Sequence, residues 1–163
     1  MSPKVTANHK EQRRKEIMHA AVEVFKRKGF EPVTMKDIVE ESGMSRGGVY
    51  MYFSSTEEIF RAILDEMEAS EEQQLARLFE QGLNMWGVVD KLLEEQEHQI
   101  ERVAEGLTPA VFEYFFTGWR EKNRDAYMVE RYKRAIRQWA PFLEAAVERG
   151  ELQPRMPVES MFK

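Results

Sequence analysis

A turn at Gly43, between two short stretches of helical periodicity, is the feature that most constrains what this chain can fold into. Before the turn, Thr34 stands three residues ahead of Asp37, which is the spacing of a residue that caps a helix N-terminus. After it, Ser45 can cap a further helix, predicted over residues 46–53. Glycine takes a positive φ angle without steric cost, so Gly43 allows the two helices to cross steeply. This segment therefore predicts a helix-turn-helix.

Helical spacing of apolar residues continues on both sides of this motif. A long helix should follow it from a capping box of Ser55 and Glu58, with residues 68–74 exposed because nearly all of them are polar. Residues 1–9 should form a loose arm. Beyond the motif, helices are predicted over residues 11–28, 55–81, 88–103, from 108 onward and over 124–149. The predicted fold class is all-α, with a three-helix domain over residues 1–54 joined by the long helix to a second helical domain over residues 55–163.

The charge of the chain is unevenly distributed. The formal net charge is -5, yet residues 1–53 hold ten Lys and Arg against seven Asp and Glu, a balance of +3, which leaves -8 for the remainder. A basic N-terminal third on an acidic body suits a protein whose first part contacts a polyanion. Chance scatter of charge in a helical protein is the alternative explanation.

Composition excludes several classes of protein. No apolar run approaches the ~18 residues of a membrane span, and the N-terminus lacks the apolar core of a signal peptide, so we expect a cytoplasmic protein that does not enter a membrane. The absence of cysteine excludes disulfides and thiolate chemistry, and the three histidines show no metal-ligand spacing. No catalytic motif or phosphate loop is present. We therefore predict no enzyme activity, no metal and no cofactor.

The helix predicted after Gly43 has an outward face that helix stability alone does not explain. Val49 and Phe53 supply its inward face, while Gly47 and Gly48 lie on the outside. Each glycine lowers helix stability by roughly 1 kcal/mol relative to alanine. A function that needs glycine at these positions is therefore favoured, such as close approach of the helix backbone to another molecule. The major groove of DNA accepts a helix, and arginine can read guanine there in bidentate fashion. A tolerant first helical turn is the alternative reason for the two glycines.

Two runs in the N-terminal third resemble the DNA-binding domain of TetR-family transcriptional regulators: A-V-E-V-F-K-R-K-G-F over residues 21–30 and T-M-K-D-I-V-E-E-S-G-M-S-R-G-G-V-Y-M-Y-F over residues 34–53. The resemblance implies that Arg46 reads a base and that Tyr50 and Tyr52 contact phosphates. The full DNA-facing set that it implies is Thr34, Lys36, Ser45, Arg46, Gly47, Gly48, Tyr50, Met51 and Tyr52.

One position departs from the family pattern. Where the family usually has a lysine shortly after its Y-x-Y-F run, this chain has Thr56. The Thr56 hydroxyl at a free helix N-terminus could still hold a phosphate, so Thr56 joins the DNA-binding set. The charge-assisted contact is lost, and with it about one unit of the salt dependence of DNA binding.

The C-terminal half carries bulky side chains that could contact a small molecule. The residues predicted to bind such a ligand are Trp86, His98, Phe112, Phe115, Phe116, Trp119 and Met128, with Glu97 and Glu101 as polar groups nearby. An aromatic cavity with one or two carboxylates favours a flat or cationic hydrophobic molecule. Ordinary core packing is the alternative for each of these aromatic residues.

The resemblance implies a regulator that acts as a homodimer on a double-stranded, pseudo-palindromic DNA operator. Such proteins are most often repressors, released when a small-molecule effector binds the C-terminal domain. Since similar chains usually continue with two dimer-forming helices, we expect that this sequence, ending in residues 158–163, is truncated. A helical protein-interaction module that does not bind DNA is the alternative function.

Overall fold

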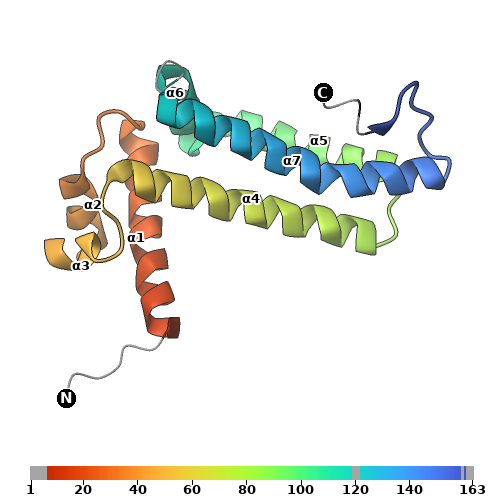
Figure 1. Cartoon of the computed structure of the whole chain (residues 1–163). Helices are drawn as coiled ribbons and strands as arrows, with labels where there is room; N and C mark the ends of the chain where they lie inside the picture. The colour runs from red at the N-terminus through yellow and green to blue at the C-terminus, as the bar shows by residue number, and fades with distance from the viewer. Residues whose placement is uncertain (1–6, 119–121, 159, 161–163) are drawn as a thin grey trace. The chain divides into compact units, whose positions relative to one another are not determined.

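The computed structural model describes residues 7–118, 122–158 and 160, and the regular structure in these residues is entirely helical (Figure 1). The described α-helices are α1 (Ala7–Lys28), α2 (Met35–Ser42), α3 (Arg46–Tyr50), α4 (Thr56–Glu80), α5 (Met85–Glu101), α6 (Thr108–Thr117) and α7 (Lys122–Glu148), with a short 3-10 turn over Val103–Glu105. The all-α fold class is confirmed, and α7 continues through Pro141.

The chain forms two compact units. The N-terminal unit comprises the residues up to Glu68 together with Val103–Tyr114, and the C-terminal unit comprises Ala69–Arg102 together with the residues from Phe115 onward. Helices α4 and α6 therefore each contribute to both units. The predicted division into a DNA-binding domain over residues 1–54 and a regulatory domain over residues 55–163 is a division by function, and it stays a prediction.

Four aromatic rings form the centre of the N-terminal unit. Phe25 of α1 meets Phe60 of α4 edge-on at 4.7 Å between ring centroids, and Phe30 lies 4.9 Å from Phe60. Tyr114 of α6 completes the cluster at 4.7 Å from Phe30 and 5.1 Å from Phe60. All four side chains are buried. Edge-on aromatic pairs add to the free energy gained from burying apolar area, so this cluster fixes α1, α4 and α6 together.

Helix α6 also holds the backbone where α1 ends. The Glu113 carboxylate accepts hydrogen bonds from the backbone N–H of Phe30 at 2.6 Å and of Glu31 at 3.4 Å. Gly29 precedes these donors with a φ of 79°, and a Cβ at this position would collide with the Glu113 carboxylate. Glycine is thus needed here both for its backbone conformation and for the close approach of Glu113.

A polar network joins α4 to α6 beside the aromatic cluster. Arg61 Nε donates to the Tyr114 hydroxyl at 2.9 Å, and that hydroxyl donates to Glu57 Oε1 at 3.0 Å. Arg61 also pairs directly with Glu57 at 2.6 Å. Burial raises the pKa of Tyr114, although its hydrogen bond from Arg61 opposes the shift. The buried hydroxyl of Tyr114 therefore has a hydrogen-bond donor in Arg61 and an acceptor in Glu57.

Among the described residues, the C-terminal unit has fewer buried apolar side chains than the N-terminal unit. Phe79 of α4 stacks on Phe142 of α7 with 4.3 Å between ring centroids, in accord with the parallel course of these segments in Figure 1. At the start of α5, the Met85 N–H donates to Glu151 Oε2 at 2.7 Å, which ties the chain after α7 to this helix. The larger apolar side chains of this unit that remain exposed are Trp86, Leu93, Ile100, Phe116, Val129, Tyr132 and Met156.

Three details of the predicted helices are wrong. Helix α1 begins at Ala7, so residues 7–9 are helical rather than part of an arm. Helix α3 ends at Tyr50 rather than Phe53, because the Tyr52 N–H donates to the Val49 carbonyl only three residues before it, which is a turn bond and not an α-helical bond. Glu68 is buried, since it lies four residues after Leu64 on the buried face of α4.

Candidate nucleic-acid interface

Helix α2 is fixed by a reciprocal cap at its N-terminus. The Asp37 N–H donates to Thr34 Oγ1 at 3.3 Å, and the Thr34 N–H donates to Asp37 Oδ2 at 2.9 Å. The Thr34 hydroxyl also donates to Asp37 Oδ2 at 2.9 Å, and Lys28 of α1 pairs with Asp37 Oδ1 at 2.7 Å. The predicted capping arrangement is confirmed. Because the hydroxyl proton of Thr34 is used inside the chain, Thr34 positions α2 first, and its contact with DNA stays a prediction.

This cap depends on the ionised form of Asp37. The hydrogen bond from Lys28, followed by those from the Thr34 backbone and side chain, lowers the pKa of Asp37 from 3.8 to about 2. A carboxylate that accepts several hydrogen bonds is stabilised in its charged form. At neutral pH Asp37 is therefore ionised, and its ion pair with Lys28 joins α1 to α2.

The turn and α3 follow the sequence prediction closely. Gly43 ends α2 in the left-handed conformation with a φ of 63°, and Ser45 Oγ accepts from the Gly48 N–H at 3.1 Å at the start of α3. Val49 and Phe53 are buried with Ile38 of α2, so they anchor the inner side of α3. The opposite side of the helix is left facing solvent.

The exposed residues of this opposite side include most of the predicted DNA-facing set. Arg46 and Gly47 are exposed, as are Tyr50 at 42% and Met51 at 76% of the side chain's full exposure. Tyr52 is half-buried. On α2, Lys36 reaches into solvent and makes only a loose pair with Glu40 at 3.6 Å. These side chains can be approached by a partner without unfolding either helix.

The two glycines of α3 differ. A Cβ at Gly48 would lie 3.1 Å from Ser45 Oγ, so the capping hydroxyl already gives a reason for a small residue there. A Cβ at Gly47 would meet nothing within 4 Å. The chain itself therefore gives no steric reason for glycine at position 47, so close approach of another molecule and a tolerant first helical turn both stay possible explanations.

The start of α4 differs from the expectation. The Glu58 N–H donates to Ser55 Oγ at 3.1 Å as a cap requires, but the Glu58 carboxylate accepts from the N–H and hydroxyl of Ser54, each at 2.7 Å. The hydrogen bond from the Ser54 hydroxyl, followed by that from its N–H, lowers the pKa of Glu58. The Ser55 half of the expected capping box is thus present, whereas the Glu58 carboxylate binds Ser54. The contact of Thr56 with a phosphate stays a prediction.

The basic residues at the start of α1 are partly engaged within the chain. Arg13 pairs with Glu16 at 2.7 Å and Lys15 lies 3.8 Å from Glu66. The Arg14 guanidinium lies over the Phe53 ring, with its Cζ 5.1 Å from the ring centroid. This last contact joins α1 to the segment after α3, and no local sequence signal indicates it.

The predicted ligand contacts do not gather in one unit. Phe112 belongs to the N-terminal unit and is exposed, whereas Trp86, His98 and Phe116 are exposed residues of the C-terminal unit, Phe116 at 73%. Exposed side chains do not by themselves enclose the aromatic cavity that the sequence suggested. Phe115 and Met128 are half-buried, and Trp119 lies outside the described residues. The role of the whole set in ligand binding stays a prediction.

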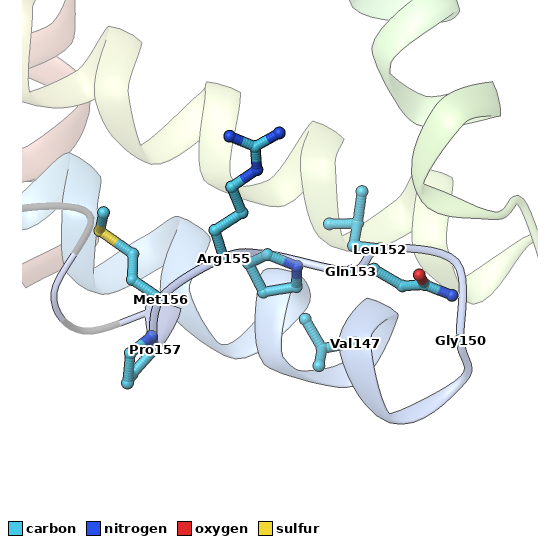
Figure 2. A pocket seen from close by; sticks show the side chains of 8 residues that line it. Val147, Gly150, Leu152, Gln153, Arg155, Met156 and Pro157 are labelled. Atoms are coloured by element: carbon cyan, nitrogen blue, oxygen red, sulfur yellow. The ribbon is translucent and has the colours of Figure 1, made fainter.

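A pocket of the C-terminal unit lies where the chain leaves α7. Figure 2 shows it between Val147 of that helix and the segment that follows. Its lining residues are Val147, Gly150, Leu152, Gln153, Pro154, Arg155, Met156 and Pro157. None of the predicted ligand contacts is among them.

The described part of the chain contains no cluster of three or more His, Asp or Glu side chains that could hold a metal ion. None of its helices is long and apolar enough to cross a membrane.

Comparison with known proteins matches both halves of the chain. A family model described as bacterial regulatory proteins, tetR family, matches residues 17–63. A second, described as tetracyclin repressor-like, C-terminal domain, matches residues 88–163.

Individual relatives agree with these models. The chain is 44% identical to the HTH-type transcriptional regulator YfiR of Bacillus subtilis, over all of this chain and 79% of YfiR. It is 26% identical to the HTH-type transcriptional repressor KstR2 of Mycobacterium tuberculosis, over 93% of this chain and 74% of KstR2. The solved structure of Salmonella enterica GusR matches with a TM-score of 0.72 at 25% identity, over 97% of this chain and 79% of GusR.

These matches confirm the resemblance read from residues 21–53. The N-terminal pattern also predicts a protein of the YfiR type within the family, and the match to YfiR confirms this prediction. Because the family consists of transcriptional regulators, the prediction that the chain is not an enzyme is also confirmed. The chain belongs to the TetR family of DNA-binding transcriptional regulators.

Proposed function

We propose that this regulator is a repressor that binds a pseudo-palindromic operator as a homodimer and leaves it when a small hydrophobic molecule binds the C-terminal helices. The observation that carries the DNA-binding part is the outer face of α3. There Arg46, Gly47, Tyr50 and Met51 lie exposed on a helix whose inner side is anchored by buried Val49.

The chemistry of this face suits the major groove. Arg46 can donate two parallel hydrogen bonds to a guanine edge, and Gly47 lets the helix backbone come close. Tyr52 and Lys36 can donate to phosphates on either side, which fixes the position of the helix without reading sequence. The family assignment favours this function over the alternative of an interaction module that does not bind DNA.

A homodimer would bring two copies of α3 to successive major grooves, ~34 Å apart. The exposed apolar residues Trp86, Leu93 and Ile100 of α5 support a partner for the C-terminal unit, because they recur every seven residues and so lie along one line of the helix.

The relative KstR2, which is named a repressor, supports repression as the outcome of DNA binding. Since the matching family model describes bacterial regulatory proteins, which act on DNA inside the cell, we propose that the protein works in the cytoplasm.

Release by an effector is energetically demanding. Shifting a population from 1:99 to 99:1 takes about 5.5 kcal/mol of differential binding, so one molecule must contact the two states very differently. We propose the aromatic residues predicted from the sequence as its contacts, and α4, which contributes to both units, as the element that carries the change. Release by an effector would be supported by a hydrophobic molecule that raises the melting temperature of the protein and lowers its affinity for the operator.

The test of the proposed function is selection of bound sequences from a random pool of DNA duplexes by the full chain. We expect enrichment of an inverted repeat whose half-sites lie about one helical turn, or a multiple of it, apart. Enrichment of the repeat would establish sequence reading and dimer symmetry together. Recovery of unselected sequence, with no steep dependence of binding on salt, would contradict the proposal.

A further inference from the structure

We propose that Tyr50 is a positioning residue for Arg46, and that its ring, rather than its hydroxyl, is what the operator-binding surface requires. The proposal rests on the proposed function, in which Arg46 reads a base. It differs from the role predicted from the sequence, in which Tyr50 contacts a phosphate.

The two side chains are stacked in the free protein. Arg46 Cζ lies 5.4 Å from the centroid of the Tyr50 ring. The residues are four apart, at the first and last positions of α3, so they lie on the same face one helical turn apart. A guanidinium within about 6 Å of a tyrosine ring centroid is attracted by the electron-rich face of the ring.

The ring is the contact that orients Arg46 in the free chain. Within the described residues, Arg46 takes part in no ion pair and no side-chain hydrogen bond. By contrast, Arg13, Lys15 and Lys28 are each held by a carboxylate. Since a long side chain without a partner samples many rotamers, the Tyr50 ring limits the orientations from which Arg46 meets DNA.

The backbone under the ring is itself well fixed. Ser45 Oγ holds the Gly48 N–H at the start of α3, and Val49, next to Tyr50 in the chain, is buried. On the other side of Tyr50, the Met51 N–H donates to the Gly47 carbonyl at 3.1 Å. The ring is therefore attached to a constrained turn, although the ring itself is exposed to solvent.

Stacking is compatible with base reading because the two contacts use different parts of the guanidinium. The ring meets the flat face of the group, whereas the N–H donors point outward in its plane. A bidentate pair with guanine needs these in-plane donors. Tyr50 can thus hold Arg46 in place without taking up the groups that read the base.

The experiment compares Tyr50→Phe with Tyr50→Leu in the full chain. The phenylalanine variant keeps the ring and removes the hydroxyl, and the leucine variant removes the ring and keeps apolar bulk. The quantity measured is the ratio of affinities for the operator selected by the wild-type protein and for a scrambled duplex of the same composition, at one salt concentration. Arg14→Gln removes the other guanidinium–ring contact of this unit and should leave this ratio unchanged.

We expect Tyr50→Phe to keep the wild-type ratio and Tyr50→Leu to lower it by about two- to thirty-fold, the range that corresponds to an exposed or a desolvated cation–ring contact. In an Arg46→Ala background, Tyr50→Leu should lower the ratio no further, because the two residues act as one unit. Circular dichroism of the variants should match the wild type, since the Tyr50 side chain is not part of the core.

Two failures are distinguishable. If the wild-type protein itself does not discriminate between the duplexes, the proposed function fails and the positioning role fails with it. If the wild type discriminates and the two variants lose the ratio equally, the hydroxyl explains Tyr50 and only the positioning role is overturned. The positioning role would also be overturned if Tyr50→Leu lowered the affinity ratio by the same factor in the wild type and in the Arg46→Ala background.

Discussion

The two units of the chain use their apolar side chains in opposite ways. In the N-terminal unit, Phe25, Phe30, Phe60 and Tyr114 are buried against one another, and the exposed Tyr50 and Met51 belong to the candidate DNA interface. In the C-terminal unit, large apolar residues of α5 and α7 lie on the surface of the single chain. The comparison teaches that the N-terminal unit has an aromatic core of its own, whereas the C-terminal unit leaves apolar side chains uncovered in the single chain, which we propose a partner molecule covers.

Helix α6 carries both buried and exposed apolar side chains. Up to Tyr114 it belongs to the N-terminal unit, where Glu113 and Tyr114 hold α1 and α4. From Phe115 it belongs to the C-terminal unit, and Phe116 is exposed. A single helix thus carries both the buried Tyr114 and the exposed Phe112 and Phe116, on different faces.

The largest effect should come from opening the aromatic cluster. Phe60→Ala should destabilise the protein by about 3–5 kcal/mol, because it removes a buried ring and leaves a cavity among three others. Denaturant unfolding followed by circular dichroism measures this change. Val129→Ala, at an exposed position of α7, is the matched control and should stay within about 0.5 kcal/mol of the wild type. Equal losses for both variants would contradict the contrast between the units.

A smaller effect should follow from removing one hydroxyl. Tyr114→Phe deletes the group that accepts from Arg61 and donates to Glu57, so we expect a loss of about 1–2 kcal/mol in the free energy of unfolding. Tyr132→Phe changes an exposed tyrosine of α7 and should have no measurable effect. If the two variants were equally stable, the network between α4 and α6 would contribute nothing to the fold.

The smallest effect concerns the dependence of stability on pH. Since the pKa of Asp37 is lowered to about 2, its contribution is present above its ordinary value of 3.8 and is lost as the pH falls from about 4 toward 2. Because the pair with Lys28 is partly exposed, the contribution should not exceed about 1 kcal/mol. Asp37→Asn should reduce the acid-dependent loss of stability, measured by unfolding at pH 4 and pH 2. An unchanged pH profile would show that the cap does not depend on the charge of Asp37.

The sequence predicted those features that depend on neighbours along the chain. Thr34, Gly43 and Ser45 mark the ends of α2 and α3 because a cap or a left-handed residue acts within one turn of its helix. The outward position of Arg46 followed from the spacing of Val49 and Phe53. For the same reason, the family resemblance could be read from the local pattern of residues 21–53.

Contacts between distant segments were not predictable in this way. Glu113 binds the backbone of Phe30, and Tyr114 joins the aromatic cluster, because folding brings α6 to the end of α1. Nothing in the local pattern of residues 108–117 indicates this partner. The stacking of Arg46 on Tyr50 likewise depends on side-chain orientations that apolar spacing does not specify.

The central claim is that the outer face of α3 reads DNA sequence through Arg46. The most direct measurement is a binding titration of wild-type protein and Arg46→Ala against the selected operator and a scrambled duplex. We predict that Arg46→Ala loses about 1–3 kcal/mol of discrimination while it remains folded, because Arg46 is exposed and makes no ion pair within the described residues. Discrimination that survived unchanged in Arg46→Ala would contradict the claim.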